Sequence, residues 1–414
     1  MTAYLTLRTD WGKEHAVDYI SRLLTRELGT DVKVGDVEFH PFETLGLEDV
    51  LILDHHSDSL LFIQDLHSNI GLFTLKDKIF NLERIEFRNG LIRIIRYPGE
   101  DQDNIQSIID KLSPEDSDKE KWEFSIESVG MFNMRIQRFD LNDETKNPGV
   151  FDASHISLSK LNAELDEIEL LEGGVRIRTS ELSLEEHSGL RINRLDSKLH
   201  ITGEQVDISD MILETAGSAL YGAISIDYSS PGSDELLIDA NLDHSQLEVS
   251  DLRYFIPEYG GVNGSINLEA KIIGQLKDLL VQEASVGFGR GSTMYMDGRL
   301  RGLPNIDSLW IGADIRRFES EVNDLKYLPV PGMKDQIAKL PEMADRIGRF
   351  RFDGNFTGYL EDFSSDGVLN TEIGEAQARI DVRIGQDNQD NIYDGLLTFK
   401  EIDLGHLLEN KDLG

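Results

Sequence analysis

Apolar and polar residues alternate along most of this 414-residue chain. Residues 266–272, for example, read Ile-Asn-Leu-Glu-Ala-Lys-Ile, with an apolar side chain at every second position. Successive side chains of a β-strand point to opposite faces of its sheet, so such runs predict strands with one apolar and one solvated face. This pattern is typical of antiparallel sheets. We therefore predict a mainly β fold built from a repetitive antiparallel sheet, with a few short helices.

Two segments show helical spacing instead. The first predicts an amphipathic helix that Thr9 or Asp10 caps and that ends at Gly29, a residue suited to a left-handed C-terminal cap. A second apolar stripe, within residues 105–112, ends before Pro114. The stripe of the first helix consists of Ala16, Val17, Ile20, Leu23, Leu24 and Leu28.

The chain is strongly acidic, with 41 Lys and Arg residues against 77 Asp and Glu residues and a formal net charge of −36. Binding to nucleic acid or to an anionic bilayer surface through charge needs a basic footprint, which this sequence lacks. The chain contains no cysteine, which excludes disulfides, thiol nucleophiles and thiolate metal sites. No apolar run reaches the roughly 18 residues that a membrane-spanning helix needs.

The second half of the sequence contains an internal repeat. Residues 266–279 match residues 350–363 without a gap, and residues 240–254 match residues 313–327. Each copy reads as a strand, a short helix, a Pro-containing loop and a long strand that ends in Gly-x-Leu-x-Asp. We divide the chain into a segment with the amphipathic helix (1–30), an N-terminal β region (31–235), the β repeats (236–395) and the truncated start of a further repeat (396–414).

Repeats that stack on their neighbours bury a continuous internal face. Periodicity leaves two interpretations of that face open. It is sealed as a dry core or sandwich, or it stays partly open as a groove whose length grows with the number of repeats. An open groove would suit a long amphiphile better than a small substrate.

The N-terminal residues resemble those of a known family. They comprise, in order, Thr9-Asp10-Trp11-Gly12, the helix to Leu28-Gly29, Val32-Lys33-Val34-Gly35-Asp36-Val37, Leu45-Gly46-Leu47-Glu48-Asp49-Val50, Asp54, Asp58-Ser59-Leu60-Leu61 and Leu66. In this order the chain resembles the AsmA-like superfamily, and in particular the N-terminal part of its TamB-like members. The Gly-x-Leu-x-Asp repeat resembles the later β segments of the same family.

This resemblance implies an elongated sheet curled into a U-shaped apolar groove that carries phospholipid between the inner and outer membranes. It also implies a periplasmic location, an N-terminal inner-membrane anchor, and an outer-membrane barrel partner of the Omp85 type that is bound through a C-terminal domain. We expect this chain to lack both the anchor and that domain. The alternatives are a scaffold or chaperone that assists the assembly of outer-membrane β-barrel proteins with an Omp85-type partner, and a structural rod with a closed core.

A lipid conduit needs an apolar surface but no nucleophile, metal or cofactor, and we expect none here. Exposing an acyl chain to water costs about 0.8 kcal/mol per CH₂, so a continuous apolar face lowers the barrier to crossing an aqueous gap. Phospholipid acyl chains are the expected partner. The candidate groove-lining residues are the alternating apolar ones: Ile224, Ile226, Ile266, Leu268, Ile272, Phe350, Phe352, Phe356, Ile380, Val382 and Ile384.

The motifs that suggest an enzyme have simpler explanations. Neighbouring His55 and His56 would point to opposite faces of a strand, and their surroundings read as a turn, so we expect no metal site there. Residues 287–291, Gly-Phe-Gly-Arg-Gly, precede a predicted strand and read as a hairpin instead of a phosphate loop. The acidic segments 140–144 and 387–391 lack the spacing of an EF-hand. We expect no enzymatic activity.

Overall fold

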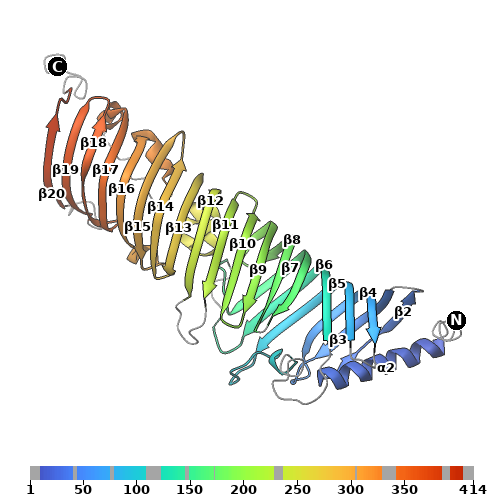
Figure 1. The fold of residues 1–414 in the computed structure, drawn as a ribbon. Coiled ribbons are helices and arrows are strands. Elements are labelled where there is room, and N and C mark those ends of the chain that lie inside the picture. Colours follow the sequence, from blue (N-terminus) through green and yellow to red (C-terminus); the bar gives the residue numbers. More distant parts are fainter. Residues whose placement is uncertain are drawn as a thin grey trace. The chain divides into compact units, whose positions relative to one another are not determined.

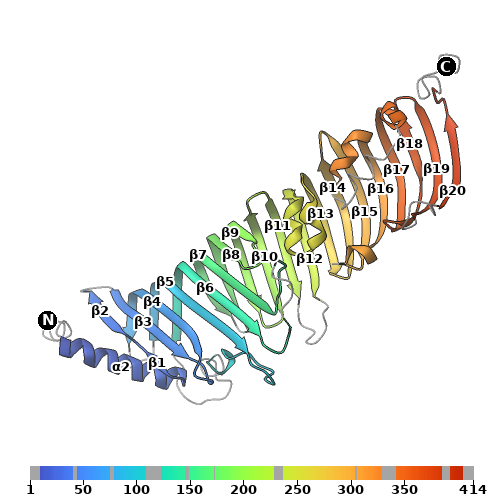
Figure 2. The same ribbon diagram turned by 180° about the vertical axis from the view of Figure 1, so that it is seen from behind.

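The computed structural model describes residues 10–40, 44–74, 79–108, 123–144, 149–171, 173–227, 236–303, 305–328, 342–384 and 392–403. The chain divides into two compact units, Met1–Leu199 and His200–Gly414. The described residues include twenty strands, one long α-helix, five short 3₁₀ helices and an α-helical segment at 106–108 (Figures 1 and 2), which confirms the predicted mainly β class. The boundary that we predicted after residue 235 lies inside the second unit.

The predicted N-terminal helix is α2 (Asp10–Leu28). Gly29 follows it with a φ of 68° and donates its N–H to the carbonyl of Thr25, as expected of a left-handed cap. One stripe of α2, with Val17, Ile20 and Leu24, packs against the buried core of the first unit. That core contains Val34, Val37, Leu47, Val50, Ile63, Met134 and Leu161. Within the described ranges, no helix is both long and apolar enough to cross a membrane.

The first unit is a sheet with one parallel strand pair. Strands β5 and β6 run in the same direction, from the pairing of Ile79 with Glu123 to that of Arg96 with Asp140, where we predicted antiparallel pairing throughout. Residues 97–122 separate the two strands, which is long enough for the crossover that a parallel pair requires. The strands are β1 (Val32–Lys33), β2 (Asp36–His40), β3 (Thr44–Leu53), β4 (Ser59–Thr74), β5 (Ile79–Arg96), β6 (Glu123–Asp140), β7 (His155–Leu171), β8 (Gly174–Glu186) and β9 (Arg191–Thr202).

In the second unit, each strand from β10 to β20 pairs antiparallel with the next. Among the described residues, strands β10 and β20 do not pair with each other, so the sheet does not close into a barrel. The strands are β10 (Gln205–Glu214), β11 (Ala219–Asp227), β12 (Leu237–Glu248), β13 (Ser265–Gln275), β14 (Asp278–Phe288), β15 (Ser292–Arg301), β16 (Trp310–Glu321), β17 (Arg349–Tyr359), β18 (Asp362–Thr371), β19 (Gly374–Arg383) and β20 (Ile392–Lys400). The 3₁₀ helices are η1 (Val249–Tyr254), η2 (Pro257–Gly261), η3 (Ile306–Ser308), η4 (Val322–Tyr327) and η5 (Glu342–Ile347).

The sequence repeat is also a structural repeat. Strand β12, helix η1 and the hairpin β13–β14 recur as β16, η4 and β17–β18, at the offsets seen in the sequence. The predicted hairpin at 287–291 is confirmed, since β14 ends at Phe288 and β15 begins at Ser292. The start of a third copy, residues 397–399, lies in β20. The proline-containing loop of the second copy (329–341) and the acidic segment 387–391 lie outside the described residues.

The repeat carries a glycine at a position where a side chain would not fit. Gly274 and Gly358 have φ values of 131° and 140°, and a Cβ on either would lie 2.4 Å from the carbonyl oxygen of Asp278 or Asp362. Each glycine is the fourth residue before the aspartate of its Gly-x-Leu-x-Asp motif, where the strand turns into the next. The repeated glycine therefore follows from backbone geometry.

We expect Gly358→Ala to destabilise the second unit by about 1 to 3 kcal/mol, because alanine meets both an unfavourable φ and the Asp362 carbonyl. Gly287→Ala is the control, since its Cβ would meet nothing closer than 3.6 Å and its φ is not positive. Urea unfolding of both variants, followed by circular dichroism, measures the difference. Equal stability of the two variants would contradict this explanation of the motif.

β-Bulges interrupt the strand register in both units. Non-glycine residues with positive φ lie at mid-strand positions, among them Asn133, Glu181 and Glu283, and the pairing shifts near these positions. The N–H of a bulged residue has no ladder partner, and a side chain of the next strand accepts it instead: Asp297 Oδ1 lies 2.7 Å from the Glu283 nitrogen. Asp196 does the same for Glu181. Bulges bend their strands and increase their twist, which curves a sheet.

Candidate functional site on the apolar face of the sheet

The strand register of the second unit aligns apolar side chains into rows that cross the sheet. We define row A as the residues paired in succession from β10 to β20. All of them occupy one face, because directly paired residues share a face. Row A consists of Ile208, Ile224, Ala240, Ile272, Val281, Gly298, Ala313, Phe356, Ser365, Ile380 and Gly395.

Two further rows flank row A on the same face. Row B crosses the same eleven strands, and row C runs from β13 to β20. Row B consists of Val206, Ile226, Ile238, Gly274, Leu279, Leu300, Ile311, Gly358, Phe363, Val382 and Tyr393. Row C consists of Leu268, Val286, Met294, Phe318, Phe352, Leu369, Ala376 and Phe399. We call the three rows together the apolar face.

The structure brings most of the predicted groove-lining residues onto the apolar face. Ile224, Ile272, Phe356 and Ile380 lie in row A, Ile226 and Val382 in row B, and Leu268 and Phe352 in row C. Ile266 and Phe350 lie two residues beyond row C on their strands, and therefore on the same face. Ile384 is half-buried and follows the end of β19.

Most of these side chains are half-buried instead of sealed. Of the eleven predicted residues, Ile266 and Val382 are buried, and the other nine keep an intermediate exposure. Among the described residues, the strands of this unit follow one another in a single row, and the 3₁₀ helices lie near the strand ends (Figures 1 and 2). We see no second sheet stacked on rows A and B there, as a β-sandwich would require.

One end of the face is covered. Val249 of η1 packs with Ile266 and Phe288 in a small buried cluster, to which residues of η2 and η4 add their side chains. Beside it, the Phe318 ring lies edge-on to the Phe350 ring, with 5.5 Å between their centroids. The short helices of the repeat therefore close this margin of the sheet, while rows A and B lie farther along the strands.

The opposite face of the same strands is charged and paired. Arg299 donates two hydrogen bonds to Asp278, at 2.6 and 2.5 Å, and these bonds lower the pKa of the Asp278 carboxyl. Arg351 binds Asp353 in the same way, and lowers the pKa of that carboxyl as well. Arginine–carboxylate pairs on an exposed face contribute little to stability, but their charges keep that face hydrated.

A search for apolar residues at every second position does not find all the apolar residues of the bulged strands. In β14, Val281 is followed on the same face by Ala284, because the bulge at Glu283 inserts one extra residue. Strand β16 shifts in the same way between Ile315 and Phe318. A search for apolar residues that alternate, skip one residue and then alternate again would have found both strands.

The first unit has a shallow pocket of about 640 Å³ over β6 to β9. Its apolar lining comes from Ile126, Ile168 and Ile177. Two ion pairs border it, Arg176 with Glu169 at 2.5 Å and Arg178 with Glu167 at 3.3 Å. An apolar floor beside paired charges is compatible with an amphiphilic ligand.

No known protein family, curated protein or solved structure matches this chain.

Proposed function

We propose that this chain is part of a non-enzymatic, periplasmic bridge whose apolar face carries phospholipid between the inner and outer membranes. The observation that carries the proposal is that row A crosses eleven strands on one face. Six of its residues are half-buried apolar side chains, and the other five are small residues. The six are Ile208, Ile224, Ile272, Val281, Phe356 and Ile380. An acyl chain that lies along such rows exchanges water for apolar side chains at every strand it crosses. Each CH₂ group that the acyl chain removes from water contributes about 0.8 kcal/mol, so many weak contacts in series hold a lipid without a specific pocket.

The charged opposite face supports the same proposal. The carboxylates with lowered pKa values on it, such as Asp278 and Asp353, are paired with arginines, so they are solvating groups instead of acid–base catalysts. In the proposed assembly an inner-membrane anchor and an Omp85-type outer-membrane barrel define the two ends of the bridge. We include the anchor and the barrel in the proposal because the N-terminal residues resemble those of the AsmA-like superfamily.

The direct test is the lipid content of the purified chain. We expect organic extraction and mass spectrometry to recover phospholipid from protein purified without detergent. We also expect delipidated protein to take up a fluorescent phospholipid from vesicles. Protein that is lipid-free on purification and takes up no fluorescent lipid would contradict the proposal.

A second candidate function, a scaffold for nascent outer-membrane strands, rests on the edge strand β20. In the described part of the chain β20 pairs only with β19, and its apolar side chains are exposed, with Tyr393 at 70% and Phe399 at 61%. An open edge with exposed apolar side chains can accept an added strand through main-chain hydrogen bonds. Crosslinks from β20 to unfolded outer-membrane protein, in the absence of lipid adducts on row A, would favour this function.

A further inference from the structure

Two neighbouring histidines of the first unit converge on one carboxylate. Nε2 of His56 lies 2.7 Å from Oε1 of Glu100, and Nε2 of His55 lies 3.1 Å from Oε2 of the same residue. His55 and His56 occupy the turn between β3 and β4, and Glu100 lies in the turn that follows β5. The expected turn is confirmed. Our argument that adjacent histidines point apart fails here, because it holds only in an extended strand.

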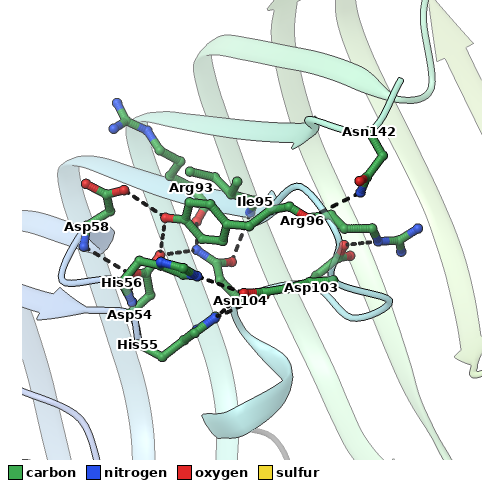
Figure 3. A network of polar contacts seen from close by, with 12 residues as sticks. Asp54, His55, His56, Asp58, Arg93, Ile95, Arg96, Asp103, Asn104 and Asn142 are labelled. Atoms are coloured by element: carbon green, nitrogen blue, oxygen red, sulfur yellow. Dashed lines mark hydrogen bonds and ion pairs between the residues drawn. The ribbon is translucent and has the colours of Figure 1, made fainter. Parts of the chain in front are cut away.

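The turn itself aims the two imidazoles. Asp54, which is 5% exposed, accepts the backbone N–H groups of His56 and Asp58, each at 2.9 Å. These bonds form an Asx turn. Figure 3 shows both histidine rings extending from this turn in the same direction. Their centroids are 4.4 Å apart.

A second layer of contacts fixes this arrangement. The Tyr97 hydroxyl lies 2.8 Å from a carboxylate oxygen of Asp54 and 2.8 Å from one of Asp58, and its ring lies against the His56 ring at a centroid distance of 4.0 Å. Buried Asn104 donates a hydrogen bond of 2.8 Å to Asp54 (Figure 3). The two turns are thus joined below the histidines, independently of Glu100.

We propose that His55, His56 and Glu100 bind a first-row divalent cation, with Zn²⁺ as the best match. Two imidazole nitrogens and one carboxylate are a common three-residue ligand set for zinc, and water completes the coordination. Bonds of about 2.0 to 2.2 Å to a tetrahedral ion place ligand atoms roughly 3.3 Å apart. The nitrogen–oxygen separations of 2.7 and 3.1 Å would need to widen by roughly 0.6 and 0.2 Å to reach that spacing.

The chemistry of the donors favours zinc over calcium or magnesium. Hard cations prefer an all-oxygen shell, whereas imidazole nitrogen suits zinc and its neighbours in the first row. The histidine side chains are 44% and 45% exposed, so the ion can enter from solvent and keep bound water. A bound ion would link the β3–β4 turn to the turn after β5, in addition to the Tyr97 and Asn104 contacts.

Another cluster of the chain provides an internal control. Asp243, His244 and Glu269 also bring three possible ligand atoms together, and all three residues are exposed. They offer one imidazole instead of two, and His244 lies at a β-bulge with a φ of 44°. We therefore expect zinc to prefer the His55, His56 and Glu100 site.

The test is Zn²⁺ titration of the tag-free full chain in competition with a chromogenic chelator. We expect one equivalent to bind, and His55→Ala, His56→Ala and Glu100→Gln each to weaken binding at least about tenfold, as loss of even an outer-shell partner does. Tyr97→Phe, which keeps the ring but loses the hydroxyl, should weaken it by a smaller factor. His244→Ala should leave it unchanged.

Circular dichroism of every variant checks that the fold is retained, which we expect because His55, His56 and His244 are exposed and the half-buried Tyr97 and Glu100 receive conservative replacements. Zinc affinity that is unchanged in a folded His55→Ala/His56→Ala double variant would overturn the proposal. So would the absence of any stoichiometric binding to the wild-type chain, or a loss of binding in His244→Ala equal to that in His56→Ala.

Discussion

Phospholipid uptake should fall at least about tenfold when carboxylates replace Ile272 and Phe356 in row A. An acyl chain that lies along row A would bring hydrocarbon against an ionised carboxylate, and a charge in an apolar environment costs several kcal/mol. Each 1.4 kcal/mol is a factor of ten in binding. Both positions are half-buried in one layer of sheet, where the new carboxylates reach water as long as no lipid covers them. The measurement is transfer of a fluorescent phospholipid from vesicles to the Ile272→Glu/Phe356→Glu variant.

The control uses the adjacent positions of the same strands. Lys271 and Asn355 are exposed on the opposite face, so Lys271→Glu/Asn355→Glu adds two carboxylates to β13 and β17 without touching row A. We expect this variant to take up lipid as the wild type does. An apolar replacement, Ile272→Met/Phe356→Leu, should also retain uptake. Similar losses in the row A variant and in the opposite-face control would show that uptake does not depend on row A.

Ile63→Ala is expected to lower the free energy of unfolding of the first unit by about 2 to 5 kcal/mol. Ile63 is 1% exposed and lies in the same buried cluster as Met134, also 1% exposed. Gly90, paired with Ile63, has little room for a side chain because its Cβ would lie 2.9 Å from the carbonyl oxygen of Phe62 and against the Met134 side chain, so the surroundings are already closely packed. Truncation should therefore leave a cavity.

Hydrogen exchange read peptide by peptide over β3 to β6 measures this change. Leu141→Ala is the control, because Leu141 is 48% exposed and its truncation should change stability by no more than about 0.5 kcal/mol. If the two variants exchanged at the same rate, the cluster around Ile63 would not be the stabilising core of this unit.

Sequence patterns predicted the fold class well because apolar and polar residues alternate along most strands. Alternation identified β11, β13, β17 and β19, and helical spacing with Gly29 identified α2. The same rule could not reveal that β5 and β6 are parallel, since direction depends on the path of residues 97–122 and not on which face a side chain occupies.

The remaining features depend on contacts that are distant in sequence. Row A became visible only through the pairing register, since bulges shift the phase of the apolar residues within β12, β14 and β16. The histidine cluster depends on Glu100, which lies 44 residues from His56. No local pattern indicates that these two turns meet.

The central claim is that row A is an accessible apolar surface for acyl chains. It is tested most directly by a photoreactive amino acid placed at Phe356, and in a second variant at Thr357, which is exposed on the opposite face. After irradiation with phospholipid vesicles, intact-mass spectrometry should show lipid adducts at position 356 and none at position 357. Equal labelling at both positions, or no lipid adduct at position 356, would contradict the claim.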